Sequence, residues 1–177
     1  KELDDINKKI DDKKAEQTKE ENSIYQGSLD KDVAAKLDKK LGNGFAKKVE
    51  EVAKNIGCDP ADLVGMMYSE SGLTTTAVNP NGGATGLIQF MPLTAEYLGT
   101  TIDDLLEMED YEQLEYVKKY FKPYAHRIES LEDMYMAILM PKCIGKTPDY
   151  NVFSSYKAYK QNIILDLNKD GKVTIEE

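Results

Sequence analysis

The sequence predicts an all-α fold, and three observations lead to that prediction. Apolar residues recur at the three- and four-residue spacing of helices in several segments. Typical N-capping residues precede these segments, and glycine or proline follows them. No long stretch alternates apolar and polar residues as a half-buried strand would. We expect at most a small hairpin, in the Asn- and Gly-rich stretch "NPNGG".

Composition narrows the possible classes of protein. The chain has 177 residues, 41% of them hydrophobic and 31% charged, as expected of one soluble globular domain with additional segments. Its net charge of -9 argues against nucleic-acid binding, which relies on Lys and Arg to neutralise phosphates. No apolar run is long enough to span a bilayer. Because the first residue is Lys1, we expect a fragment or a processed form.

The first part of the chain differs from the rest. Residues 1–43 are dense in Lys, Asp and Glu and carry too little apolar surface to fold alone. We therefore predict a charged N-terminal arm or linker, which attaches the remainder to a larger polypeptide.

Two helices are predicted next. The first would run from Phe45 to Gly57 and bury one apolar face, formed by Phe45, Val49, Val52, Ala53 and Ile56. The second would begin at the N-cap Asp59, with Pro60 in its first turn, and end at Gly72.

Later helices have similar boundaries. Starts are predicted at Thr101, at Asp110 with Gln113 three residues later, and at Ser130. Proline ends two of these runs, at positions 123 and 141.

The two cysteines, Cys58 and Cys143, are too few for a disulfide framework, and we expect buried free thiols in preference to a pair.

One carboxylate stands out. Glu70 falls in the last turn of the second helix, on the same side as Leu63, Met66 and Met67. Burial and the negative end of the helix dipole both disfavour its charged form, so both raise its pKa. A proton donor to a glycosidic oxygen needs such a pKa. The alternative role is an acid that only pairs or caps at a helix end.

The loop after Glu70 suits a carbohydrate ligand. "NPNGGATG" contains small residues that let the backbone approach a ligand closely. Gln89 and Asn79 can exchange hydrogen bonds with sugar hydroxyls, and Phe90 and several of the 11 tyrosines could form apolar platforms for sugar rings. Taken alone, such a loop is more often only a turn.

The combined motif "ESGLTTTAVNPNGGATGLIQFMPLTAEYLG" resembles the signature of lytic transglycosylases with a goose-type lysozyme-like domain. The later "MYMAILMPKCIGKTPD" resembles the phage-associated branch of that family. The resemblance extends from about residue 45 to residue 177. It implies a lysozyme-like helical domain, which we place at residues 44–165.

The resemblance also implies a chemistry. Glu70 would be the single catalytic acid at the β-1,4 bond between N-acetylmuramic acid and N-acetylglucosamine of peptidoglycan. It would then help the muramic 6-hydroxyl to attack, leaving a 1,6-anhydro end. Ser71 would orient Glu70, while Gln89 and the backbone around Gly86 would hold the glycan.

One family feature is missing. Many members carry Ala-Tyr-Asn-Ala-Gly in a later helix, and the tyrosine of that motif lies near the acid. The comparable stretch here reads "MAILMPKCIG". Tyr135 and Tyr159 are the two candidates to replace that tyrosine. The single histidine, His126, is interpreted as a surface or structural residue.

The chain closes with "DLNKDGKVTIEE", which fits a 12-residue EF-hand loop. Gly171 stands at the sharp turn, Val173 at the β-branched position and Thr174 at the position that usually binds through water. This predicts a Ca²⁺ site over residues 166–177, packed on the helical domain, with oxygen ligands from Asp166, Asn168, Asp170, Lys172 (backbone carbonyl) and Glu177.

These observations favour an enzyme that cleaves peptidoglycan glycan strands, as part of a phage tail or another cell-wall-penetrating machine. Its partners would be virion tail proteins or a larger parent polypeptide. It would be virion-associated or secreted, acting in the periplasm or cell wall. The alternatives are a lysozyme that uses the same glutamate with water, a non-catalytic structural or glycan-binding module, and a calcium-responsive interaction protein.

Overall fold

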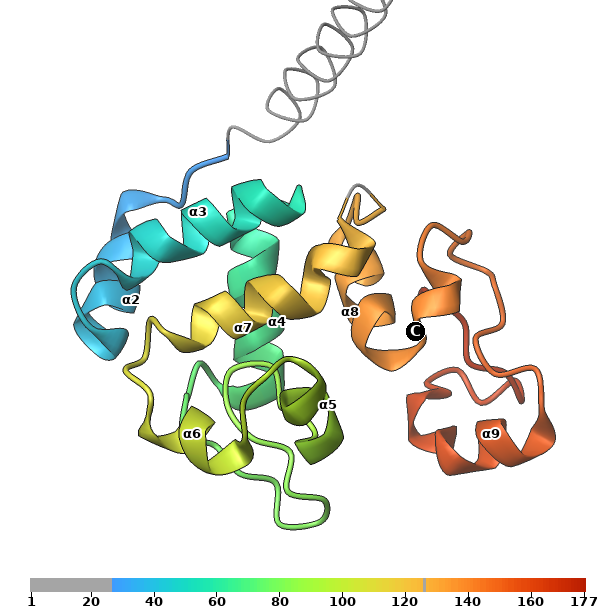
Figure 1. Ribbon diagram of the computed structural model, residues 1–177. Helices are drawn as coiled ribbons and strands as arrows, with labels where there is room; N and C mark the ends of the chain where they lie inside the picture. Colours follow the sequence, from blue (N-terminus) through green and yellow to red (C-terminus); the bar gives the residue numbers. More distant parts are fainter. Residues whose placement is uncertain (1–26, 126) are drawn as a thin grey trace, which may run out of the picture.

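The computed structural model describes residues 27–125 and 127–177, and within this part the protein is built of helices (Figure 1). His126 and residues 1–26 of the expected arm lie outside the described residues. The described residues contain isolated β-bridges and no β-sheet. The bridges pair Val78 with Thr85, Thr85 with Phe90, and Asn151 with Thr174. The all-α prediction is therefore confirmed.

Helix α2 (Lys31–Leu41) corrects the expected extent of the arm. Asp30 caps it by accepting a hydrogen bond from the Asp32 N–H at 2.8 Å. Leu29, Leu37 and Leu41 are buried, and α2 packs against the following helix, α3. Its few apolar residues share one face, and that face is enough for a helix that docks on a neighbour. This part of residues 1–43 thus belongs to the folded body.

The two helices that lead to Glu70 form as predicted. Helix α3 (Phe45–Ile56) ends at Gly57, whose φ of 78° is the left-handed conformation that glycine adopts readily. Helix α4 (Pro60–Ser71) begins at Asp59, whose carboxylate accepts from the Ala61 N–H. The α3 face expected to be buried is buried, and α3 packs against α4.

Four further helices complete the helical body. They are α5 (Pro92–Tyr97), α6 (Ile102–Glu107), α7 (Gln113–Phe121) and α8 (Leu131–Leu139). Thr101 and Ser130 cap α6 and α8 as predicted, whereas α5 was not anticipated. The prediction that Asp110 caps α7 is wrong, because the N-cap is Glu112, two residues later. The Asp110 carboxylate accepts a hydrogen bond from the Thr75 hydroxyl and does not cap the helix.

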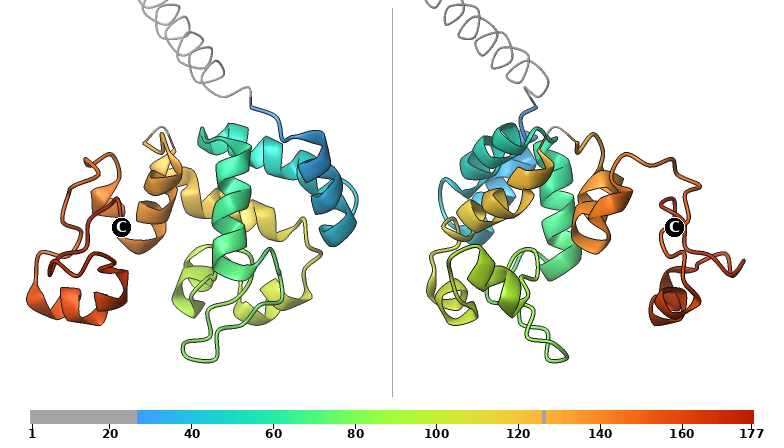
Figure 2. Two further views of the ribbon diagram at one scale, coloured as in Figure 1. Left: turned by 180° about the vertical axis from the view of Figure 1, so that it is seen from behind. Right: turned by 45° about the vertical axis from the view of Figure 1, so that its right-hand side comes forward.

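Helix α4 runs through the middle of the body, with α3 and α7 crossing it and α8 beside it (Figures 1 and 2). α7 packs against α3, and α8 packs against α4. The end of α4 leads into the loop that follows it, below the level at which α7 crosses the helix (Figure 1). The stretch with the Asn- and Gly-rich sequence projects from the body beyond this end of α4 (Figure 2).

The C-terminal segment stands beside α8 and away from α3 in each view (Figures 1 and 2). It contains α9 (Tyr156–Gln161) and the short 3₁₀ turn η3 (Ile163–Leu165). The Val152 N–H donates to the Val173 carbonyl at 2.8 Å, and the Glu176 N–H donates to the Pro148 carbonyl at 3.0 Å. Residues 148–152 thus pair with the last turn of the chain and hold it in place.

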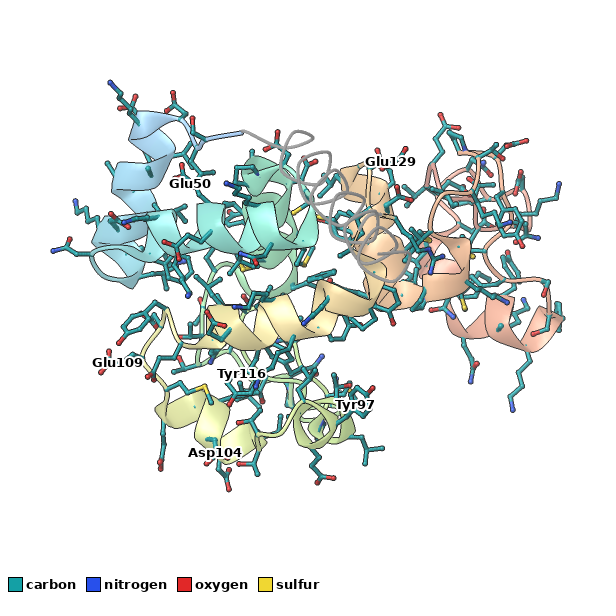
Figure 3. All side chains as sticks on the ribbon, turned by 45° about the horizontal axis from the view of Figure 1, so that its top comes forward. Glu50, Tyr97, Asp104, Glu109, Tyr116 and Glu129 are labelled. Carbon is teal, nitrogen blue, oxygen red and sulfur yellow. The ribbon has the colours of Figure 1, made fainter. Side chains whose placement is uncertain are left out.

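Charge is spread over the surface. Asp104, Glu109 and Glu129 project from separate segments at the margin of the molecule (Figure 3).

Cys58 and Cys143 are buried and free, as predicted, and burial raises the pKa of the Cys58 thiol to about 12. Among the helices of the described ranges, none has the length and apolar character that a membrane crossing requires.

Candidate active site

Glu70 occupies the last turn of α4, one residue before the helix ends. Gly72, with φ 63°, reverses the chain immediately afterwards. The side chain is half-buried, and this burial raises the pKa of the carboxyl group above its ordinary value, as predicted. Within the described ranges, no hydrogen bond or ion pair holds the carboxylate. It is therefore a partly desolvated carboxyl group without a partner among the described residues.

Ser71 ties the end of α4 to the next loop. Its hydroxyl lies 3.0 Å from the Leu87 carbonyl and 3.1 Å from the Met67 carbonyl, and can donate to either. The same oxygen accepts from the Thr74 N–H at 3.2 Å. These contacts fix the backbone beside Glu70.

Gly86 and Gln89 direct their polar groups into the turn that they form. Gly86 is buried with φ 79°, and its N–H donates to the Ala77 carbonyl. The Gln89 side chain donates to the carbonyls of Ala77 and Gly86, at 3.3 and 3.2 Å. Gln89 itself has φ 54°, an uncommon conformation for a residue other than glycine. In this arrangement the polar groups of both residues are engaged within the loop that follows α4.

Phe90 does not offer an open platform, because its side chain is only 2% exposed. Its ring meets that of Tyr120 edge to face, with 6.5 Å between centroids. The expectation that Phe90 contacts a sugar ring is therefore replaced by a role in the core beneath the site.

Tyr120 of α7 is a residue that sequence reasoning missed. Its hydroxyl donates to the Ala137 carbonyl of α8 at 3.2 Å. Burial raises the pKa of Tyr120 to about 12, and the charges of Tyr124 and Glu70 add to the effect. A carboxylate shifts a phenol in this way only when the two groups are near. Tyr120 thus lies within the electrostatic range of Glu70.

The two tyrosines singled out in the sequence lie elsewhere. Tyr135 lines a groove of about 440 Å³ between α8 and the C-terminal segment, with Ser69 at its margin. The Tyr159 hydroxyl donates to Asp166 Oδ2 at 2.6 Å, which places it in the C-terminal loop. Of these two tyrosines, Tyr135 lies in a groove that is also lined by Ser69, the residue before Glu70.

Gln113 was predicted only as a helix-start residue, yet it is fully buried. It is the first residue of α7, and its side-chain amide reaches back toward the turn at Gly86. One feature of the sequence hinted that Gln113 is buried, namely its position directly before the apolar Leu114. A glutamine at the start of a helix is nevertheless far more often exposed.

The C-terminal loop folds tightly around its acidic residues. The Asp170 N–H lies 3.1 Å from Asp166 Oδ1 and 2.8 Å from Asn168 Oδ1, so these two oxygens lie on the same side of the loop. Glu177 Oε1 accepts from the Asn168 N–H at 3.2 Å. Over residues 27–125 and 127–177, no group of three or more His, Cys, Asp and Glu side chains is arranged to hold a metal ion. A site here would need amide and carbonyl oxygens as well as carboxylates.

A helical body with an unpaired, desolvated glutamate at the end of a central helix fits the lysozyme-like class. The family model described as "Transglycosylase SLT domain" matches residues 47–137, slightly more than half of the chain. The chain therefore belongs to the SLT transglycosylase family, whose members are lytic transglycosylases of peptidoglycan. The match includes Glu70, Ser71, Gly86, Gln89 and Gln113. No curated protein and no solved structure matches the chain.

Proposed function

We propose that this chain is a lytic transglycosylase that cleaves the β-1,4 bond between N-acetylmuramic acid and N-acetylglucosamine, with Glu70 as its single catalytic residue. One observation carries the proposal. Glu70 is a half-buried carboxyl group with a raised pKa, located inside the family match. A general acid needs a pKa close to the working pH, and burial shifts the pKa of Glu70 in that direction.

The proposed reaction has two proton transfers. Protonated Glu70 donates its proton to the bridging oxygen, and the bond from the muramic C1 to that oxygen breaks with its electron pair on the oxygen. The Glu70 carboxylate then takes the proton of the muramic 6-hydroxyl while that oxygen bonds to C1. A 1,6-anhydro end forms, Glu70 is protonated again, and no water is consumed.

Mass spectrometry of the products of purified peptidoglycan tests this proposal. We expect anhydro-muropeptides from the wild type. Reducing ends that depend on Glu70 would instead identify a lysozyme-type hydrolase with the same acid. A folded protein that releases no product would point to a structural or glycan-binding module.

We further propose that the C-terminal loop binds Ca²⁺ through oxygens of Asp166, Asn168, Asp170, Glu177 and the backbone carbonyl of Lys172. Support comes from the donor chemistry, since hard cations take six to eight oxygen ligands. Gly171, with φ 89°, permits the turn, and Asp166 accepts from the N–H groups of Asp170 and Gly171. Because Val173 pairs with Val152, an ion in this loop would fasten the C-terminal segment to residues 148–152.

Calcium is therefore expected to raise the melting temperature. An ion that binds only the folded state at about 100 times its Kd adds roughly 2.7 kcal/mol of stability. Thermal melting in calcium and in chelator measures this, with magnesium as the control ion. Asp170→Asn should reduce the calcium response while leaving the melting temperature in chelator nearly unchanged. Equal melting of the wild type in calcium and chelator would contradict the proposal.

We also propose that the domain reaches its substrate as part of a larger polypeptide or a phage tail, not by free diffusion. The net charge of -9 supports this, because bacterial walls are often anionic and repulsion slows encounter. Added freely to cells, the protein should lyse them more slowly at low salt, where the screening length exceeds about 10 Å. Fastest lysis at the lowest salt concentration would count against this proposal.

A further inference from the structure

We propose that Gln113 is a positioning residue for Glu70, acting through Leu87 and Ser71. This inference rests on the function proposed above. It concerns a side chain on a different helix from the acid, linked to the end of α4 by the hydrogen bonds on the two sides of Leu87.

The first link is the Gln113 amide itself. Its Nε2 group donates to the Thr75 carbonyl at 2.8 Å and to the Leu105 carbonyl at 2.6 Å. Its Oε1 accepts from the Leu87 N–H at 3.1 Å. Both amide hydrogens are thus in use, and one side chain joins the loop after α4, the end of α6 and the turn at residues 86–89. A buried network that is fully satisfied in this way favours a single arrangement.

The second link is Leu87, whose two backbone polar groups lie in successive peptide groups and are both bonded. Its N–H donates to Gln113 Oε1, and the Ser71 hydroxyl lies 3.0 Å from its carbonyl oxygen. Leu87 is fully buried, so neither group can exchange its partner for bulk water. A displacement of the Gln113 amide is therefore transmitted to Ser71, the residue that follows Glu70.

Gly86 supports the same assignment. A Cβ atom at this position would lie 2.5 Å from Gln113 Oε1. The absence of a side chain at residue 86 therefore makes room for the Gln113 amide. We infer that this glycine serves the positioning network, in contrast to the sequence-based expectation that it contacts the glycan.

The consequence for the acid follows from burial. The 86–89 turn is tied to the end of α4, and desolvation is what raises the pKa of Glu70. If the turn moves, water gains access to the carboxyl group and its pKa falls toward the ordinary value. Tyr120 of α7 is the titratable neighbour whose pKa responds to Glu70, so its contribution must be followed as well.

The test compares Gln113→Met, Ser71→Ala and the double variant with the wild type. The pKa of Glu70 is measured by carboxyl ¹³C NMR, and the rate of muropeptide release is measured against pH. We expect the alkaline limb of the rate profile and the measured pKa to fall together, so that the rate of the variants at pH values above that limb falls below the rate of the wild type. Ser71→Ala, at a half-buried position, keeps the test usable if Gln113→Met folds poorly.

Val117→Ala is the matched control, because Val117 is a fully buried residue of the same helix. It should lower the melting temperature without moving the limb or the pKa. The double variant should shift no further than Gln113→Met alone, since both changes interrupt one path. The inference would be overturned if the pKa shifts of the two single variants added in the double variant. It would also be overturned if the pH–rate profile of Gln113→Met equalled that of Val117→Ala. A wild type that shows the raised pKa but cleaves nothing would refute the proposed function alone.

Discussion

Glu70→Gln is expected to lower the rate of muropeptide release by about 10²- to 10⁴-fold, the usual contribution of a positioned general acid. Glutamine keeps the shape of the side chain but has no proton to donate at neutral pH and takes up none from the 6-hydroxyl. Release of anhydro-muropeptides by the variant and the wild type measures the effect. Glu96→Gln, at an exposed position of α5, is the matched control and should retain full activity.

The same substitution is expected to stabilise the fold at neutral pH. Burial raises the pKa of Glu70 above 4.5, so the folded state binds its proton more tightly than the unfolded state. The wild type therefore loses stability relative to the variant as pH rises from 4.5 through the raised pKa. The two melting temperatures should coincide below pH 4 and separate by pH 8. An active variant would contradict the catalytic assignment, whereas a melting difference of opposite sign would contradict the burial argument.

Gly86→Ala is expected to produce the largest loss of stability among the glycine substitutions. Alanine at φ 79° costs about 1–2 kcal/mol in backbone strain. Its methyl group would also meet the buried Gln113 amide at 2.5 Å, and overpacking typically adds about 1–3 kcal/mol. Denaturant unfolding should therefore show a free energy of unfolding lower by about 2–5 kcal/mol.

Gly99→Ala separates the two causes. Gly99 has a similar φ of 84°, but nothing lies within 4 Å of the position that a Cβ would occupy. It should show the backbone strain alone, and the difference between the two variants then measures the contact with Gln113. Equal losses at both positions would mean that the Gln113 amide gives way without cost.

Much of the helical body could be predicted from the sequence because its signals are local. Asp59, Thr101 and Ser130 each cap a helix through their own side chains, and Gly57 ends α3 with a conformation that favours glycine. Helix α2 was underestimated because its stability comes from leucines that contact α3, and docking of this kind has no local signature.

The position of the acid could also be predicted, whereas its surroundings could not. The helix end that contains Glu70 follows from spacing, and its raised pKa follows from the apolar neighbours on that face. Tyr120 and Gln113 reach the site from α7, and pairings between distant segments are not encoded in periodicity. Phe90 was misassigned because a lone aromatic after a turn has the same pattern whether it packs inward or outward.

The burial of Leu29, Leu37 and Leu41 changes how the boundary of the protein should be drawn. The family match begins at residue 47, inside α3, but α2 packs against α3 and buries part of its surface together with α4 and α7. Recombinant fragments cut at the family boundary would expose that surface to solvent and to other copies of the chain, a known cause of aggregation. The evolutionary unit and the cooperative folding unit therefore differ here by one helix.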